Sequence, residues 1–263
     1  MKRASLVVAL AATVYSGVVA AAEADATTDE PQLTLPGGKV FLDAFVEVSL
    51  SKDLAFKPVS LAPDIWYGIS DDLTLGLVHS ARGATGLWGS SGDGLCFVGK
   101  SRECPKVYNN VGVDARYHLF RKGGIALAAD GGLYAMSLDP FWLSLKLGGI
   151  AHFGFGAFSI EVGPNIFVGI TKRSDGNKEE LTIPVNFMYA LPMRLGIAAQ
   201  LGAWIPFRDT DFYMFGASLG VQYFATDKLI LDAVISLPAL AGGGAVADGV
   251  DIRTFTLGVG YAF

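Results

Sequence analysis

Three features of the sequence predict an all-β protein, an antiparallel up-and-down β-barrel of twelve strands that spans a membrane. The chain is 51% hydrophobic and 17% charged, with a mean hydropathy of +0.42, which is unusually apolar for a soluble domain. Beyond residue 22, however, no apolar run reaches the roughly 18 residues that a membrane helix needs. Apolar and polar side chains instead alternate with a period of two, which is typical of strands with one face in lipid.

The first 22 residues have the three parts of a secretory signal peptide. Lys2 and Arg3 are basic, residues 4–19 are apolar, and small residues follow. We expect cleavage after Ala22 or Ala24. A permanent N-terminal anchor is the alternative, but the small residues lie where a signal peptidase cuts.

Residues 23–39 form a polar segment that prolines and glycines interrupt. Such a segment buries too little surface to offset the entropy lost on ordering it. The sequence therefore predicts a flexible periplasmic lead-in to a barrel formed by residues 40–263. A plug that crosses the lumen once is the alternative.

Twelve segments beyond residue 39 show the alternation expected of strands. Most exceed the length of about 9 residues at which a tilted strand crosses a bilayer. These segments are 40–50, 59–69, 73–80, 107–119, 125–135, 141–152, 157–170, 181–189, 194–205, 213–224, 229–237 and 253–263.

The connections between these segments give an independent check on the fold. Long connections (82–106, 171–180 and 238–251) follow odd strands, and short turns follow even strands. Outer-membrane barrels alternate in this way, with the long loops outside. A soluble sandwich or lipocalin-like barrel would bury its apolar rows and would not place Asp130, Lys146 and Glu161 on the inward rows.

The final strand, residues 254–263, carries a further signal. Its alternate residues are large and apolar, and they are Phe255, Leu257, Val259, Tyr261 and Phe263. This strand resembles the C-terminal signature strand of Gram-negative outer-membrane β-barrels, which ends on phenylalanine. The resemblance implies a location in the outer membrane and recognition by the outer-membrane assembly machinery.

Charge excludes one class of partner. The whole chain has 20 basic and 25 acidic residues, and loss of Lys2 and Arg3 with the signal leaves 18 basic residues and a formal charge of −7. Because phosphate binding needs a basic face, we expect no nucleic-acid partner.

The two cysteines, Cys96 and Cys104, lie in the longest loop. Two cysteines this close in an exported protein predict a disulfide that closes a small loop on the outer face. Metal binding is disfavoured because Asp93 is the only further ligand type at a suitable spacing. We expect no cofactor.

Adjacent His79 and Ser80 invite comparison with barrel esterases. Neighbouring residues of a strand point to opposite faces, and no Asn or Asp is placed to orient the imidazole. The sequence therefore predicts no catalytic residue and no enzymatic activity.

The inward rows carry ten charges that we expect to line the lumen: Asp43, Glu47, Asp64, Asp114, Arg116, Asp130, Lys146, Glu161, Arg194 and Asp232. Symmetric hairpins would place Asp43 opposite Asp64, Asp114 opposite Asp130, and Asp130 opposite Lys146.

Two readings of these charges remain open at this point. They form either a charged constriction or a structural network inside a filled barrel. The first predicts a narrow passive pore for ions or small hydrophilic solutes, with a weak cation preference because acids outnumber bases. The second predicts a non-conducting structural or adhesion barrel that acts through its loops. A lipid-modifying enzyme is the least supported alternative.

Overall fold

The computed structural model describes residues 31–52, 54–98, 107–208, 211–244 and 249–263. Within them, twelve antiparallel strands close a barrel, as the sequence predicts, because β1 pairs with both β2 and β14. The wall strands are β1 (Val40–Ser49), β2 (Val59–Ser70), β3 (Leu73–Val78), β5 (Val111–Lys122), β6 (Ile125–Leu138), β7 (Phe141–Phe155), β8 (Phe158–Val162), β9 (Asn165–Gly169), β10 (Glu180–Leu191), β11 (Leu195–Pro206), β12 (Tyr213–Phe224), β13 (Leu229–Gly243) and β14 (Thr254–Ala262).

The short strands β8 and β9 together form one of the twelve wall strands. Both pair with β7 on one side and with β10 on the other. Gly163 and Pro164 separate them. Since proline lacks a backbone N–H, it interrupts the hydrogen bonding at this point without opening the barrel.

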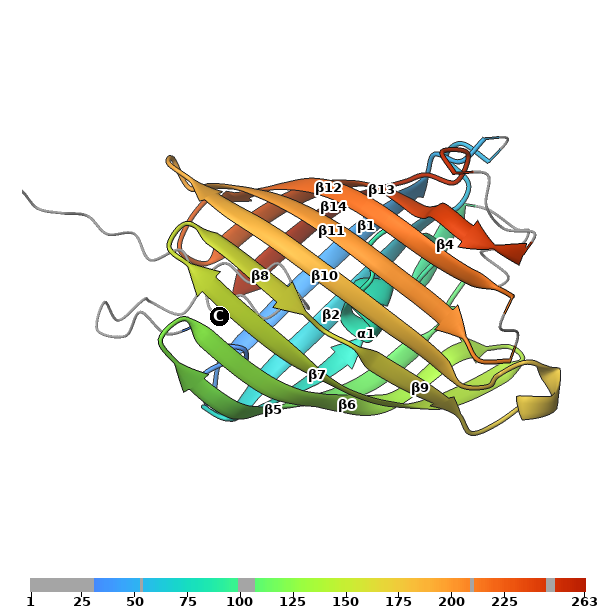
Figure 1. Cartoon of the computed structure of the whole chain (residues 1–263), viewed down its shortest axis with the longest axis horizontal. Helices are drawn as coiled ribbons and strands as arrows, with labels where there is room; N and C mark the ends of the chain where they lie inside the picture. The colour runs from blue at the N-terminus through green and yellow to red at the C-terminus, as the bar shows by residue number, and fades with distance from the viewer. Residues whose placement is uncertain (1–30, 53, 99–106, 209–210, 245–248) are drawn as a thin grey trace, which may run out of the picture.

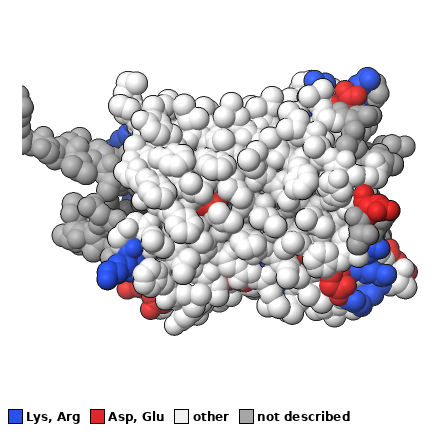
Figure 2. Space-filling model, in the orientation of Figure 1, with Lys and Arg blue, Asp and Glu red and all other residues white. Residues whose placement is uncertain are grey.

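The outer surface is an apolar belt. Side chains such as Leu119, Leu133, Leu201 and Leu219 point outward and are 49–61% exposed, whereas their neighbours along each strand are less exposed. Figure 2 shows that the lateral surface on this side is almost free of charge and that charged residues gather at the two ends. A wall of this kind matches the hydrocarbon core of a bilayer.

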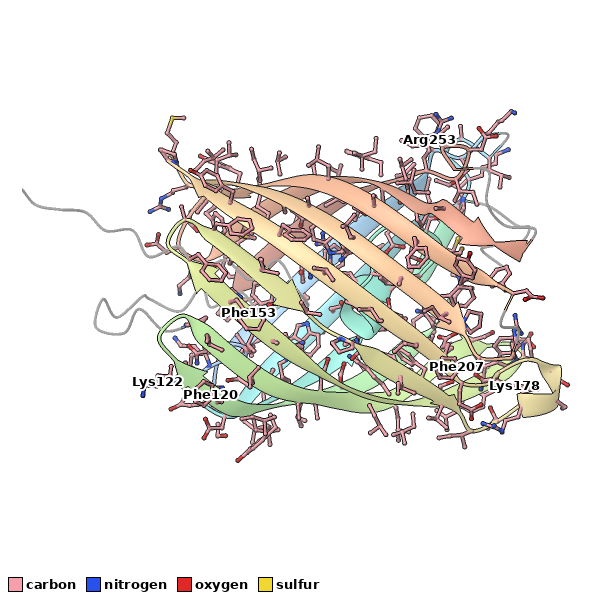
Figure 3. All side chains as sticks on the ribbon, viewed as in Figure 1. Phe120, Lys122, Phe153, Lys178, Phe207 and Arg253 are labelled. Carbon is pink, nitrogen blue, oxygen red and sulfur yellow. The ribbon has the colours of Figure 1, made fainter. Side chains whose placement is uncertain are left out.

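The ends of the barrel differ. One end carries short turns such as Gly123–Gly124 and Gly156–Ala157, and the C-terminus lies at this end in Figure 1. Figure 3 places Phe120, Lys122 and Phe153 here, and Lys178, Phe207 and Arg253 at the opposite, long-loop end. Aromatic and basic residues at both rims suit the two interfaces of a membrane.

The connection between β3 and β5 folds into the barrel, although the sequence predicted an external loop. It contains α1 (Ala81–Thr85), which Figure 1 shows inside the barrel, and β4 (Leu95–Val98), which pairs with β2. We call residues 79–94 the inward loop. Ser80 caps α1, because its hydroxyl accepts a hydrogen bond of 2.8 Å from the Gly83 amide.

The expected loose lead-in is also partly ordered. Leu33, Thr34 and Leu35 are at most 2% exposed. Their backbone and hydroxyl groups find partners inside the barrel: the Leu35 amide donates to Thr74 Oγ1 (2.7 Å), and Arg116 donates to the Leu33 carbonyl (3.2 Å). The prediction of a flexible segment rested on the entropy lost when the segment is ordered. Hydrogen bonds to the wall and burial of Leu33 and Leu35 offset that loss. Residues 23–30 and the predicted signal peptide lie outside the described residues.

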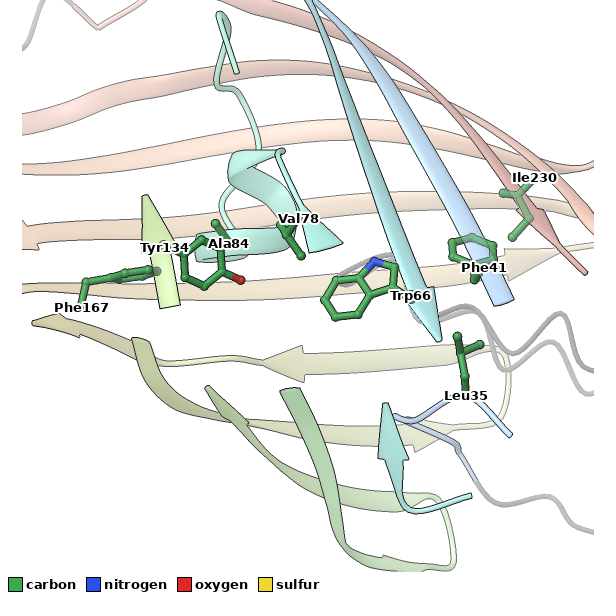
Figure 4. Close-up of a cluster of buried hydrophobic side chains, with 8 residues drawn as sticks. All are labelled: Leu35, Phe41, Trp66, Val78, Ala84, Tyr134, Phe167 and Ile230. Atoms are coloured by element: carbon green, nitrogen blue, oxygen red, sulfur yellow. The ribbon is translucent and has the colours of Figure 1, made fainter. Parts of the chain in front are cut away.

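An apolar cluster joins these inserted segments to the wall. Its members come from residues 31–36, from α1 and from the inward faces of six strands: Leu35, Phe41, Trp66, Val78, Ala84, Tyr134, Phe167 and Ile230 (Figure 4). The lumen is therefore packed over much of its length. Among the described residues, no helix is long and apolar enough to cross a bilayer.

Candidate functional site

Nine of the ten predicted lumen charges are buried inside the barrel, at 0–7% exposure: Asp43, Glu47, Asp64, Asp114, Arg116, Asp130, Lys146, Glu161 and Asp232. Arg194 is the exception and corrects the prediction. It lies in the turn before β11, with a positive φ of 60°, and pairs with the exposed Asp227 at 2.8 Å. The turn lifts its side chain out of the inward row.

Lys146 on β7 joins two carboxylates from different strands. Its Nζ lies 2.7 Å from Asp114 on β5 and 2.8 Å from Asp130 on β6. The Tyr134 hydroxyl donates a further hydrogen bond to Asp114. Three charges and a phenol thus form one buried network, and charge-assisted contacts of this kind hold the three strands' inward faces in a fixed arrangement.

The partners of Asp130 in this network differ from the sequence prediction by two residues on each neighbouring strand. Arg116, not Asp114, lies opposite Asp130, and Gly148, not Lys146, lies opposite Asp130 on the other side. The β5–β6 turn is the two-residue Gly123–Gly124, both with positive φ, rather than a turn centred on Lys122. Lys146 reaches both carboxylates because its long side chain spans diagonal neighbours.

Asp43 lies opposite Asp64, as the sequence predicts. Asp64 is not free in the lumen, because it anchors the inward loop. Its carboxylate accepts hydrogen bonds from the amides of His79 (2.7 Å) and Ser80 (3.0 Å) and from the Ser80 hydroxyl. Ser80 therefore bonds to Asp64 and not to the His79 ring, which contacts the Pro63 carbonyl and lies 2.9 Å from Tyr108 Oη.

Arg82 is a buried lumen charge that the sequence did not predict. It extends from α1 to Asp232 on β13, with 3.1 Å between Nη1 and Oδ2, and both side chains are less than 10% exposed. Its guanidinium lies 4.8 Å from the ring centroids of Phe45 and Trp88. Apolar Leu87 and Trp88 in a loop otherwise rich in glycine and serine were the available sign that this loop is buried.

Gln200 on β11 holds the far end of the inward loop. Its Oε1 accepts from the Trp88 amide (2.7 Å), and its Nε2 donates to the Gly86 carbonyl (2.8 Å) and to Asn186 Oδ1 (2.7 Å). The loop is thus attached to opposite walls, through Asp64 on β2, Asp232 on β13 and Gln200 on β11. This attachment narrows the lumen.

Other predicted site residues have local partners. Glu47 accepts a hydrogen bond of 3.0 Å from the Ser60 hydroxyl, and Glu161 lies 3.7 Å from His152 Nδ1. Within the described residues, no cluster of His, Cys, Asp and Glu is arranged to hold a metal. Cys96 is buried on β4, but residue 104 lies outside the described residues, so the disulfide stays a prediction.

Space within the barrel is restricted. A cavity of about 160 Å³ lies between the inward loop and β11–β13, and a second of about 10 Å³, the size of one water, adjoins Arg82 and Glu47. The geometry is that of a polar lumen closed down to small spaces by inserted segments.

Comparisons with known proteins identify the fold. No family model matches the sequence, and no curated protein matches it. The structure is similar to that of the NanC porin, with a TM-score of 0.60 and 9% identity over 84% of this chain and 98% of that one. It is also similar to the KdgM porin in complex with disordered oligogalacturonate (0.57, 10%, 85% and 99%) and to the COG4313 outer membrane channel from Pseudomonas putida F1 (0.54, 13%, 88% and 97%).

The closed twelve-strand wall, the apolar belt and these likenesses define the chain as an outer-membrane β-barrel with a porin-like fold. This assigns its location to an outer membrane.

Proposed function

We propose that the protein is a narrow passive pore for ions or small hydrophilic solutes. The observation that carries the proposal is the charged interior: seven acids and three bases project into the space inside an uncharged outer wall. A purely structural barrel core is made at lower cost from apolar side chains, since buried charges lose hydration. The likeness to structures described as porins and as a channel supports the same function.

We further propose a weak cation preference. Arg82, Arg116 and Lys146 leave an excess of four acids inside the barrel, counting Asp43, Glu47, Asp64, Asp114, Asp130, Glu161 and Asp232 against them. Asp43 forms no salt bridge with a basic residue among the described residues, and it lies opposite Asp64 on the neighbouring strand β2. Field lines from such acids concentrate in a narrow lumen that a low-dielectric barrel wall and bilayer surround.

In this proposal the inward loop sets the width of the passage. Current through the parent should be small, because residues 31–36 and the inward loop fill the lumen. Arg82→Gln removes the ion pair to Asp232 and should raise the unitary current. Lys122→Gln, at the exposed short-turn rim, is the matched control and should leave it unchanged.

The test is planar-bilayer recording of purified, refolded protein. Step-like currents that grow in Arg82→Gln support the pore. Silence of the parent and of Arg82→Gln at high protein load, with both correctly folded, would contradict it and favour the second candidate function. That candidate is a non-conducting structural or adhesion barrel, and the packed lumen is the observation in its favour.

Three further assignments belong to this proposal. Residues 1–22 act as a cleaved signal peptide, Cys96 and Cys104 form a disulfide, and the alternate apolar residues that end at Phe263 are read by the assembly machinery. Support comes from the residue patterns, and for the last from β14, which closes the barrel against β1.

A further inference from the structure

The cavity of about 160 Å³ lies in the long-loop half of the barrel, between the inward loop and β11–β13. Two glycines on neighbouring strands, Gly202 on β11 and Gly216 on β12, lie directly opposite each other, and both line it. The wall therefore carries no side chain at this pair. Leu87 of the inward loop packs against the bare wall, since a Cβ at Gly202 would lie 2.5 Å from Leu87 Cδ2, but the loop does not fill all of the space.

The lining of this cavity is mainly apolar and includes two indoles, Trp88 from the inward loop and Trp204 from β11. Its other large apolar side chains are Leu87, Met214 and Pro238. None of the described residues that line the cavity carries a charge. The cavity thus differs from the rest of the lumen, where buried charges prevail.

Trp88 separates the cavity from those charges. Its ring lines both this cavity and the small one beside Arg82 and Glu47, whereas neither charged residue lines the larger cavity. The Arg82 guanidinium lies 4.8 Å from the centroid of a Trp88 ring, and the Trp88 amide donates to Gln200 at 2.7 Å. These contacts hold the indole in place before any ligand enters.

Water is poorly suited to fill this cavity. A space of this size takes several waters, and each needs two to four polar partners. Thr85 and Gln200 already use their polar side-chain atoms in hydrogen bonds to the protein. Ser90 bonds to Asp93, and Trp204 donates to Glu180 at 3.0 Å. 

Two polar side-chain groups of the lining remain, the Ser218 hydroxyl and the Trp88 indole N–H, and the second has no partner within the described residues. Two groups at separate places cannot hold several waters. The lining therefore favours an occupant that needs few hydrogen bonds.

We propose that the cavity binds one small, uncharged, mainly apolar molecule the size of a single benzene ring. Its volume of about 160 Å³ is close to the roughly 150 Å³ of an engineered apolar cavity that stays dry and binds benzene. An aromatic ring packs favourably against indoles, and it restores the contacts that an empty cavity lacks. A charged ligand would be buried without a partner. This binding goes beyond the proposed function and requires no current.

Tryptophan indole resonances test the proposal. The full chain, carrying isotope-labelled tryptophan, is placed in lipid nanodiscs and titrated with benzene, benzoate and benzylammonium, which share one ring and differ in charge. We expect saturable shifts of the Trp88 and Trp204 signals with benzene. Trp66 and Trp142, which do not line the cavity, are the internal controls. The two charged rings should bind at least about tenfold more weakly.

Benzene that merely dissolves in the lipid gives shifts that do not saturate. Shifts of that kind alone, or charged rings that bind as tightly as benzene, would overturn the proposal. A barrel that conducts without binding benzene would disprove this site and leave the pore proposal standing.

Three variants locate the site. Ser218→Leu places an apolar side chain in the cavity and should abolish the saturable shifts, whereas Leu219→Phe, on the lipid face of the same strand, should not. Leu87→Ala enlarges the cavity and should raise the affinity for two-ringed naphthalene severalfold over the parent. If Ser218→Leu does not fold, Leu87→Ala decides alone. Unchanged benzene binding in folded Ser218→Leu, or unchanged naphthalene affinity in Leu87→Ala, disproves the site.

Discussion

Lys146 lies 2.7 Å from Asp114 and 2.8 Å from Asp130, and all three side chains are almost completely buried. At the scale of single residues, this network is sensitive to one substitution, because removal of Lys146 leaves two buried carboxylates without their cation. Tyr134 extends it towards the apolar cluster. The charged network and the apolar cluster are therefore in contact through Tyr134.

We predict that Lys146→Met destabilises the barrel by about 3–5 kcal/mol, because two carboxylates lose their buried cation. The triple variant with Asp114→Asn and Asp130→Asn should recover much of that loss, since neither carboxylate that Lys146 neutralised remains charged. Urea unfolding of refolded protein in vesicles measures both effects. The exposed Lys122→Met is the control. A loss in Lys146→Met no larger than in the control would mean that the network carries little stability.

At the scale of elements, β14 closes the barrel. It pairs with β1 over nine residues, and the Phe263 amide donates to the Val40 carbonyl at 2.9 Å. Leu257, Val259, Tyr261 and Phe263 point outward and are 38–58% exposed. The residues that resemble an assembly signal are thus also accessible from the membrane.

We predict that deletion of Phe263 lowers the yield of folded protein in the outer membrane more than Leu219→Ala does. Both changes remove one lipid-facing side chain, but only the deletion touches the closing strand. Heat-dependent migration on gels of membrane fractions separates folded from unfolded barrel. Equal yields for the two variants would argue against a special role of the C-terminus.

The sequence predicted the wall far better than it predicted the contents of the barrel. Alternation with a period of two located all twelve strands, because lipid on one side forces the pattern. It could not locate Arg82 in the lumen, since the inward course of its loop depends on distant partners, Asp64 and Gln200.

The register of the hairpins was the second feature that the sequence predicted only in part. The predicted facing of Asp43 and Asp64 is confirmed, whereas Asp130 has other partners than predicted because the β5–β6 and β6–β7 turns lie at residues 123–124 and 139–140, with a further irregularity beyond each turn at His118/Phe120 and Ala135/Ser137. A bulge adds one residue to one strand and leaves the polarity pattern beyond it readable. Strand position could therefore be predicted where cross-strand partners could not.

At the scale of the whole molecule, the inserted segments would limit the current through the proposed pore. Residues 31–36 fill the short-turn half, where Leu33 packs against Ala126, Ala128 and Ile150. The inward loop occupies the other half. If only one half of the lumen is opened, the other half still limits the current.

We predict that Leu33→Asp together with Leu35→Asp expels residues 31–36 from the lumen and increases conductance further in the Arg82→Gln background than in the parent. Burial of two carboxylates in an apolar cluster is unfavourable, whereas the wall strands are unchanged. Unitary currents of the four proteins form a double-mutant cycle. Strict additivity of the two changes would contradict two constrictions in series.

In the proposed pore, ion selectivity would depend on acids that the wall itself supplies. Asp43 on β1 is the most direct test, because Asp64 also anchors the inward loop and its replacement would change two things at once. We predict a reversal potential of cation-selective sign for Arg82→Gln across a potassium chloride gradient, reduced in Arg82→Gln with Asp43→Asn. Asp251→Asn is the control, since Asp251 lies in an exposed loop and pairs with Lys52 at 3.6 Å. Selectivity should fade with added salt, because at about 1 M the screening length falls to about 3 Å. Anion preference, or equal selectivity with and without Asp43, would show that the lumen acids do not set the field that permeating ions meet.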